Sequence, residues 1–347
     1  MIFQVYGNLS LIGAARSWGI VLTNIAVAVK KLGHDIRCMT TNGQANIDPR
    51  IRPYLVNGLD CNKPVFTYCS PPEIKKIDAA NVYCMTAYES SILPNGWADM
   101  MNHKRLQIIV NSTQQSVMME INGVKAVVVP LGIDPEIYRP NGDRMELAKD
   151  KYKFLSIGIP HYRKGFDILL KAFAEEFKPS EPVALVIKTD KLTKLNYWEI
   201  DIVKEIKKVQ RNRTAEIILI TGDCDNLAPL YRACNCYVSP SHGEGFGLTN
   251  YEAAACGLPV IMAESRVIKA PPAAQYHGYS PGAYMMEPVF SVLKECMRGA
   301  YCGNYKKFPA TILTWEDVAK KVLALMGIKD EEVEFKEWVE GKNAAGL

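Results

Sequence analysis

The segment from residue 239 to residue 260 constrains the fold more than any other part of the chain, because it combines a strand end, a glycine-rich turn and a short helix. Three glycines stand at alternate positions of the turn, namely Gly243, Gly245 and Gly247. Glycine lets a backbone approach a ligand closely and adopt angles that other residues avoid. Thr249 is a suitable N-cap for the helix, and Glu252, three residues later, completes a capping-box pattern. A turn whose free N–H groups lie at the positive end of a helix is suited to binding an anion.

Two glutamates in this segment, Glu244 and Glu252, are separated by seven residues and stand in the contexts Pro-Ser-His-Gly-Glu-Gly-Phe-Gly and Glu-Ala-Ala-Ala-Cys-Gly-Leu-Pro-Val. This arrangement resembles the E-x7-E motif of the retaining family 4 glycosyltransferases. The resemblance covers about residues 1–261 and 310–326. A pure capping role for Glu252 is an alternative that is compatible with ligand contact, whereas Glu244 has no capping role available.

The alternation of strand-like and helix-like segments in both halves of the chain predicts an α/β protein with two Rossmann-like domains. At 347 residues the chain is too long for one ordinary core. We expect an acceptor-side domain over residues 1–145, a nucleotide-sugar-binding domain over 146–328, and a tail over 329–347 that packs back on the first domain. The resemblance implies that two parallel sheets adopt the GT-B fold and face a cleft.

The resemblance also implies that a sugar is moved, with retention of its anomeric configuration, from a nucleotide-sugar to an acceptor hydroxyl. Glu252 would contact the ribose of the donor, Glu244 the hydroxyls of the donor sugar, and Lys164 the diphosphate. The other positions that the resemblance assigns to the donor loop are His242, Gly243, Gly245, Phe246, Gly247, Leu248 and Thr249. The expected donor substrate is a UDP- or GDP-linked sugar, and neither a cofactor nor a metal ion is expected.

The expected diphosphate loop, residues 159–164, departs from the family pattern. Its Lys164-Gly165 pair matches the pattern, but Ile159 stands where the family usually carries an arginine. One lysine seldom balances the two or so negative charges of a diphosphate in a half-open cleft. Arg163 in the same loop and Lys188 at the end of the next strand are the available replacements. We predict that Lys188 is the second cation and that Arg163 is exposed or salt-bridged; the alternative is that Lys188 is an ordinary lysine in solvent.

In the first half, Glu89 follows a strand predicted over residues 81–86. Ligands of open parallel sheets bind beyond the carboxyl ends of the strands, so Tyr88 and Glu89 are expected to point toward the cleft. The segment resembles one branch of the family in which a Glu followed by Leu-Pro replaces a His. We therefore group Glu89 with Glu244 and Lys164 as catalytic, with a helix-start carboxylate as the alternative. Gly13 is expected either to let the backbone approach the donor or acceptor or to form a plain turn.

Composition limits the classes of function without selecting one. The formal net charge of +4 permits an anionic substrate but requires neither nucleic acid nor a membrane. The ten cysteines are scattered, which fits a reducing cytoplasm. The N-terminus lacks the basic region of a signal peptide and no apolar run is long enough to span a bilayer, so we expect a cytoplasmic protein for which peripheral membrane contact stays open. Asp223 and Asp225 resemble the metal-binding D-x-D of a different fold, but they fall in the wrong half of the chain and are interpreted as loop residues.

Several acceptors are compatible with the sequence. We expect a saccharide, a lipid or a protein glycan; the alternative acceptor is DNA that carries hydroxymethylated bases. A protein of another class, which binds a nucleotide-sugar or a partner without turnover, is the second alternative. The segment 262–282, rich in Pro, Gly and Tyr, departs from the family pattern and leaves the donor sugar and the acceptor open.

Overall fold

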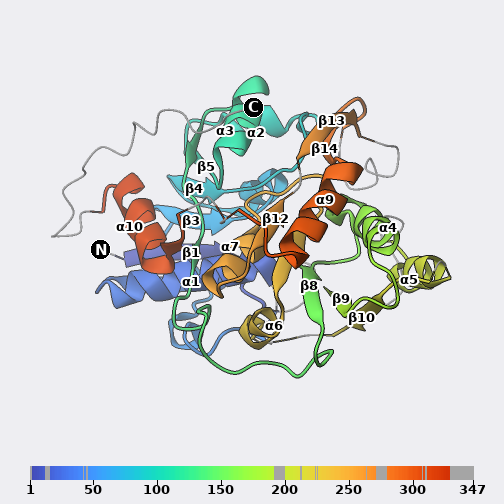
Figure 1. Cartoon of the computed structure of the whole chain (residues 1–347). Coiled ribbons are helices and arrows are strands. Elements are labelled where there is room, and N and C mark those ends of the chain that lie inside the picture. The colour runs from blue at the N-terminus through green and yellow to red at the C-terminus, as the bar shows by residue number, and fades with distance from the viewer. Residues whose placement is uncertain are drawn as a thin grey trace.

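The predicted alternation of strands and helices corresponds to two parallel sheets in the computed structural model of the chain (Figure 1). The structure describes residues 2–328 apart from residues 12–15, 42, 44, 45, 191–199, 212, 223, 225, 263, 271–279, 307, 309 and 310. Gly13, Asp223, Asp225 and the predicted tail over 329–347 therefore lie outside the described residues.

The first sheet contains six strands in the order β2-β1-β3-β4-β5-β6, and every neighbouring pair is parallel. The strands are β1 (Ile2–Gly7), β2 (Asp35–Thr40), β3 (Val65–Tyr68), β4 (Val82–Met85), β5 (Leu106–Val110) and β6 (Ala126–Val128). The inner strands β1, β3 and β4 are largely buried, as expected for a parallel sheet covered on both faces, whereas the edge strand β2 alternates exposed and buried residues at its start. The strand predicted over residues 81–86 corresponds to β4.

Helices cover both faces of the first sheet. One face packs against α1 (Arg16–Lys31), and the other packs against α2 (Trp97–Met101), α3 (Thr113–Ile121) and the 3-10 helix η2 (Pro71–Lys76). A second 3-10 turn, η1 (Arg52–Tyr54), follows β2. Ser112 caps α3 by accepting a hydrogen bond from the backbone N–H of Gln115, as its sequence context predicts.

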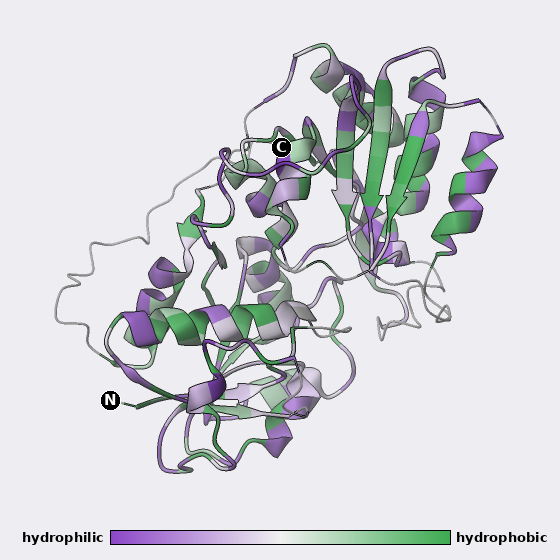
Figure 2. Ribbon diagram, turned by 90° about the horizontal axis from the view of Figure 1, so that it is seen from below, coloured by the Kyte–Doolittle hydropathy of each residue, from purple (hydrophilic) through white to green (hydrophobic). Residues whose placement is uncertain are grey.

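The second sheet contains five parallel strands in the order β10-β9-β8-β11-β12. They are β8 (Tyr152–Ile157), β9 (Val183–Lys188), β10 (Glu216–Ile220), β11 (Cys236–Ser239) and β12 (Val260–Met262). Figure 2 shows these strands mostly in hydrophobic colours, between helices that each have a hydrophilic side. This pattern is expected when helices cover both faces of a sheet.

Two groups of helices enclose the second sheet. One face packs against α4 (Phe166–Glu176), α5 (Ile202–Gln210) and α9 (Phe290–Tyr301), and the other against α6 (Ala228–Ala233) and α7 (Leu248–Ala255). The aromatic side chains at helical spacing in α4, such as Phe166 and Phe173, are fully buried in this core. The 3-10 turn η3 (Tyr162–Lys164) connects β8 to α4.

The chain returns to the first sheet near its end. The short strand β15 (Leu313–Thr314) pairs with β7 (Gly132–Ile133), and α10 (Trp315–Leu325) then packs against α1 (Figure 1). A side chain at Gly132 would lie 2.5 Å from the backbone of Thr314, so the crossing needs a glycine there. The predicted boundaries place α10 in the second domain, whereas its apolar face belongs to the first core. The division at residue 145 stays a prediction.

The atypical segment after residue 262 forms an antiparallel hairpin of β13 (Ser265–Lys269) and β14 (Tyr284–Pro288), with residues 271–279 outside the description. The hairpin extends from the second half of the chain to the first. The backbone N–H of Ser91 donates to the Tyr284 carbonyl at 3.3 Å, and the Tyr284 N–H donates to the Ser91 hydroxyl at 2.8 Å. The buried side chain of Met285 joins the core around α2 and α3.

Candidate active site

A cleft of about 560 Å³ lies between the two halves of the chain. Its walls from the first half include Asn24, Asp48, Arg50 and Asp134, and its walls from the second half include Gly158, Lys188, Leu248, Thr249 and Glu252. The second-half residues follow the carboxyl ends of β8, β9 and β11, where open parallel sheets bind their ligands. Lys188, Leu248, Thr249 and Glu252, which were expected to contact the donor, thus line one cleft, and their contact with a donor stays a prediction.

Glu252 forms part of the cleft wall and does not cap α7. Its side chain is largely buried, and its Oε2 accepts a hydrogen bond of 2.8 Å from the hydroxyl of Tyr231. Burial, together with the negative charge of Glu252, keeps the pKa of Tyr231 well above its ordinary value, so this hydroxyl stays protonated and donates. A carboxylate held in this way has a fixed orientation at the edge of the cleft.

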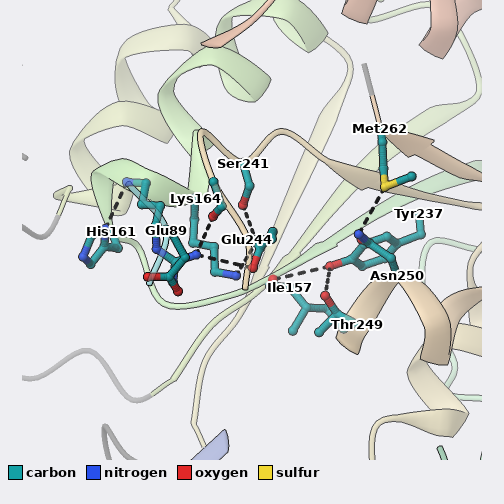
Figure 3. Close-up of polar contacts among 12 residues, drawn as sticks. Glu89, Ile157, His161, Lys164, Tyr237, Ser241, Glu244, Thr249, Asn250 and Met262 are labelled. Carbon is teal, nitrogen blue, oxygen red and sulfur yellow. Dashed lines mark hydrogen bonds and ion pairs between the residues drawn. The ribbon is translucent and has the colours of Figure 1, made fainter. Parts of the chain in front are cut away.

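The predicted capping box at Thr249 and Glu252 is wrong. The N-cap of α7 is Gly247, which has a φ of 77° and no side chain. Thr249 therefore lies inside the first turn of the helix and cannot be its N-cap. The Thr249 hydroxyl instead accepts a hydrogen bond of 2.8 Å from the hydroxyl of Tyr237 (Figure 3). Glu252 is consequently left without a capping role.

The other glycines of the turn serve a contact that the sequence did not reveal. A side chain at Gly243 would lie 2.8 Å from the carbonyl oxygen of Glu89, and one at Gly245 would lie 2.8 Å from Cβ of Ala87. Both neighbours belong to the segment after β4 in the first half. We expected these glycines to let the backbone approach a ligand, and in the structure they let it approach the other half of the chain.

Glu244 lies at the centre of an ion cluster. Its Oε1 accepts a hydrogen bond of 2.6 Å from Lys164 Nζ and another from the Ser241 hydroxyl, and its Oε2 lies 3.3 Å from Arg163 Nη1. Figure 3 shows Lys164 and Ser241 converging on the Glu244 carboxylate, with Glu89 beside them. Burial opposes ionisation of Glu244, but the charges of Lys164 and Arg163 and the hydrogen bonds outweigh it and lower its pKa to about 2. Glu244 is therefore ionised at any physiological pH.

Arg163 connects the two halves of the chain. Its Nη2 lies 3.5 Å from Glu89 Oε1, and its Nη1 donates to the Gly243 carbonyl at 2.7 Å in addition to the contact with Glu244. Its side chain is 17% exposed, so it is salt-bridged rather than solvated, which is one of the two states that we predicted. The structure thus brings Glu89, Lys164 and Glu244, the three residues predicted to be catalytic, around one arginine.

Lys188 lies in the second-half wall of the cleft, as Glu252 does. It is almost fully buried, and its ammonium donates to the carbonyl of Thr189 at 2.9 Å and to that of Gly222 at 2.5 Å. The alternative of an ordinary lysine in solvent is therefore wrong. Two carbonyl acceptors fix the charge without neutralising it. A role for Lys188 as the second cation for a diphosphate stays a prediction. Ile159, at the position of the missing arginine, is exposed at the cleft.

Two expected site residues lie in the protein interior instead. Tyr88 is buried and packs against Trp97 with ring centroids 5.4 Å apart, because apolar contacts under the hairpin and α2 draw it into the core and away from the cleft. His242 is 1% exposed and stacks on Tyr162 at 4.6 Å, and burial lowers its pKa. Neither ring nitrogen of His242 has a hydrogen-bond partner in the part of the chain that the structure describes.

The sequence analysis missed Asp48 and Arg50 in the first-half wall. Asp48 accepts hydrogen bonds from Arg50 Nε at 3.0 and 3.1 Å and from Nη2 at 2.7 Å. Burial opposes ionisation of Asp48, but the bonds from Arg50 outweigh it and lower the pKa of the carboxyl. Both residues stand in a loop without strand or helix periodicity, so an acid and a base two positions apart were the only signal.

The described residues contain neither a candidate metal site nor a membrane-spanning helix. No group of three or more His, Cys, Asp and Glu side chains there is placed to hold a metal ion. None of the helices described is both long and apolar enough to cross a membrane.

Comparison with known proteins relates the chain to sugar-transferring enzymes. Residues 151–279 match the family model described as Glycosyl transferases group 1. The chain is 32% identical over 212 residues to a D-inositol 3-phosphate glycosyltransferase of Segniliparus rotundus, covering 58% of this chain and 46% of that protein. It is 27% identical over 175 residues to the lipopolysaccharide core biosynthesis mannosyltransferase LpsB of Rhizobium meliloti, covering 49% of this chain and 48% of that protein. The chain thus spans about half the length of the curated relatives it matches.

Similarity of structure extends over nearly the whole chain. A sucrose-phosphate synthase from Thermosynechococcus elongatus superimposes with a TM-score of 0.67 at 14% identity, covering 94% of this chain and 98% of that one. At this level of identity the similarity shows the fold. The prediction of the GT-B fold, with two parallel α/β sheets, is confirmed.

Proposed function

Because residues 151–279 belong to the Glycosyl transferases group 1 family, we propose that the protein moves a sugar from a nucleotide-sugar to an acceptor hydroxyl with retention of configuration. The names of its relatives, a mannosyltransferase and an inositol phosphate glycosyltransferase, both describe sugar transfer. They match this chain over about half of their length, so the donor and the acceptor are proposed from the site itself.

The second-half wall of the cleft would hold the nucleoside. The Glu252 carboxylate, which accepts a hydrogen bond from Tyr231, would accept hydrogen bonds from the ribose hydroxyls. Lys188, held at the same wall by two carbonyls, would face the nucleoside or its first phosphate. A UDP- or GDP-linked sugar fits this polar wall.

The diphosphate would lie between the cleft and the ion cluster. We propose Lys164 and Arg163 as its cations, which departs from the expectation that Lys188 is the second cation. The N–H groups at the start of α7, near Gly245 to Leu248, would add a positive dipole. As the bond between the anomeric carbon and the phosphate oxygen breaks, negative charge develops on the leaving group. Donors fixed in advance stabilise that charge, which lowers the barrier. We propose that no metal ion is needed for this step.

Retention follows from a same-face reaction. The acceptor oxygen forms a bond to the anomeric carbon on the face that the phosphate leaves, and the acceptor proton passes to the departing phosphate oxygen. Glu244 and Glu89, the two carboxylates nearest to this region, are each ion-paired, and a paired carboxylate is a poor nucleophile. We therefore assign Glu244 to the hydroxyls of the donor sugar and Glu89 to the acceptor.

The observation that carries the proposal is the convergence of Glu244, Lys164 and Arg163. The Lys164 side chain lies next to Gly158, which lines the same cleft as Glu252. Thermal unfolding in the presence of a panel of UDP-, GDP- and ADP-sugars tests it, because a ligand that binds the folded state raises the midpoint by mass action. One donor should raise the midpoint and release its nucleoside diphosphate when saccharide, lipid or glycan acceptors are added. A shift without turnover would favour a non-catalytic nucleotide-sugar-binding protein, and a panel without any shift would contradict the proposal. Transfer to duplex DNA at low salt would identify a nucleic-acid acceptor.

A further inference from the structure

The four charges at the contact between the two halves of the chain cancel one another. Lys164 and Arg163 are positive, and Glu244 and Glu89 are negative. All four side chains are between 17% and 23% exposed, so water screens them only in part. A balanced cluster of this kind has no surplus positive charge with which to receive a polyanion.

A donor diphosphate brings about two further negative charges to the same cations. In a partly buried site, unbalanced like charges are costly, so a carboxylate must give up its partner when the diphosphate binds. The contacts of Glu244 are short and numerous, with Lys164 at 2.6 Å and Ser241 hydrogen-bonded to the same oxygen. The contact between Arg163 and Glu89, at 3.5 Å, is the longest in the cluster. The weakest partner, Glu89, should be exchanged first.

We propose that Arg163 couples the two substrate sites: a donor diphosphate displaces Glu89 from its guanidinium, and the released carboxylate then binds the acceptor hydroxyl. The inference rests on the proposed function and adds an order of binding, with the donor before the acceptor. Binding free energies are reciprocal. The Glu89–Arg163 contact therefore weakens diphosphate binding by the same factor by which a bound diphosphate weakens that contact.

The local geometry allows this exchange without a rearrangement of the backbone. Arg163 stays anchored when Glu89 leaves, because its Nη1 donates to the Gly243 carbonyl at 2.7 Å and its backbone N–H donates to His161 Nδ1 at 3.0 Å. The backbone of Glu89 is fixed by its close approach to Gly243. A change of side-chain rotamer at Glu89 is then sufficient to release its carboxylate.

The test measures binding of inorganic pyrophosphate, UDP and GDP by titration calorimetry to the full chain and four variants: Glu89→Gln, Arg163→Gln, the double variant and Glu216→Gln. Glu216 forms an exposed ion pair with Lys151 at 2.9 Å, remote from the cluster, and serves as the matched control. Glu89→Gln should bind pyrophosphate about two- to fivefold more tightly than wild type, because a competing partner of Arg163 is removed. Arg163→Gln should bind it more weakly, and the Glu89→Gln change should have no effect in that background.

A purely structural role for Glu89 would not produce tighter binding, so the sign of the effect is diagnostic. The coupling is overturned if Glu89→Gln binds pyrophosphate as tightly as wild type or more weakly, or if neither wild type nor Glu89→Gln binds it. The same gain in the Arg163→Gln background, or in Glu216→Gln, also overturns it. The variants could show the expected changes in pyrophosphate affinity while UDP and GDP bind no more tightly than pyrophosphate. That result would support the coupling and contradict the proposed function.

Discussion

The two glutamates of the motif, Glu244 and Glu252, have the same side chain but different surroundings. Glu252 lies in the second half of the chain and accepts a hydrogen bond from a neutral hydroxyl, that of Tyr231. Glu244 lies where the two halves meet and is held by two cations and a serine. A neutral partner fixes the direction of a carboxylate, whereas charged partners are shared with any anion that enters. On the proposed function, we expect the wall at Glu252 to hold the nucleoside with unchanged contacts and the ion cluster to exchange partners.

The largest effect should come from removal of Lys164. Lys164→Ala leaves Glu244 without its shortest partner and removes a donor to the leaving phosphate, so turnover should fall about 100-fold or more. Steady-state release of nucleoside diphosphate from the best donor of the panel measures this. Lys171→Ala, on the outer side of α4 over Phe290, is the control and should retain wild-type turnover. Near-normal turnover of Lys164→Ala would show that the ion cluster is not part of the donor site.

Glu244→Gln should have a smaller effect, with turnover lower by at least about tenfold through the loss of about one charged hydrogen bond. The fold should survive, since glutamine fills the same space. Thermal unfolding at pH 7 and donor turnover of the same preparation separate the two effects. Wild-type turnover in this variant would exclude Glu244 from the site.

Glu244→Gln should also change how the free energy of unfolding depends on pH. The pKa of Glu244 is about 2, below its ordinary value of 4.5, so its stabilising effect is fully present above about pH 4.5 and is lost as the pH falls toward 2. Wild type should lose up to about 3 kcal/mol of unfolding free energy over this window that Glu244→Gln does not lose. Urea unfolding of both proteins at several pH values measures the difference. Parallel curves for the two proteins would mean that the cluster does not stabilise the ionised carboxylate.

Tyr231→Phe should have the smallest of the mutational effects on activity. It removes one neutral hydrogen bond from Glu252 but no charge, so affinity for the nucleoside part should fall about two- to tenfold with little change in the maximal rate. Donor KM and kcat, measured separately, show whether the loss is confined to binding. A large fall in kcat would show that Glu252 also acts in the chemical step.

Removal of metal ions should have no effect on turnover, because the proposed site stabilises the leaving group with Lys164, Arg163 and backbone N–H groups. Donor turnover in excess EDTA, with and without added manganese or magnesium, checks this. Loss of activity that either metal restores would assign a metal role to Asp223 and Asp225, which lie outside the described residues.

Periodicity and turn residues were sufficient to predict the strand–helix alternation and two Rossmann-like halves, because these depend on local patterns of burial. The GT-B fold was implied by the family resemblance. The motif also led to the position of Glu252 at the cleft and of Glu244 beside Lys164. The capping box failed because Gly247, in a left-handed conformation, started α7 earlier than the side-chain pattern indicated. Contacts between segments that are distant in the sequence could not be predicted from local patterns. The meeting of Gly243 with Glu89, and the Asp48–Arg50 pair in the first wall, depend on how the two halves pack.

The most direct measurement of the contrast between the two glutamate environments is a paired titration. Inorganic pyrophosphate and the nucleoside of the preferred donor are each titrated into wild type, Lys164→Ala and Glu252→Gln. The account predicts that Lys164→Ala weakens pyrophosphate binding and leaves nucleoside binding unchanged, while Glu252→Gln does the reverse. If each variant weakened both probes equally, or if neither weakened either probe, the wall at Glu252 and the ion cluster would not be the two separate parts of one donor site.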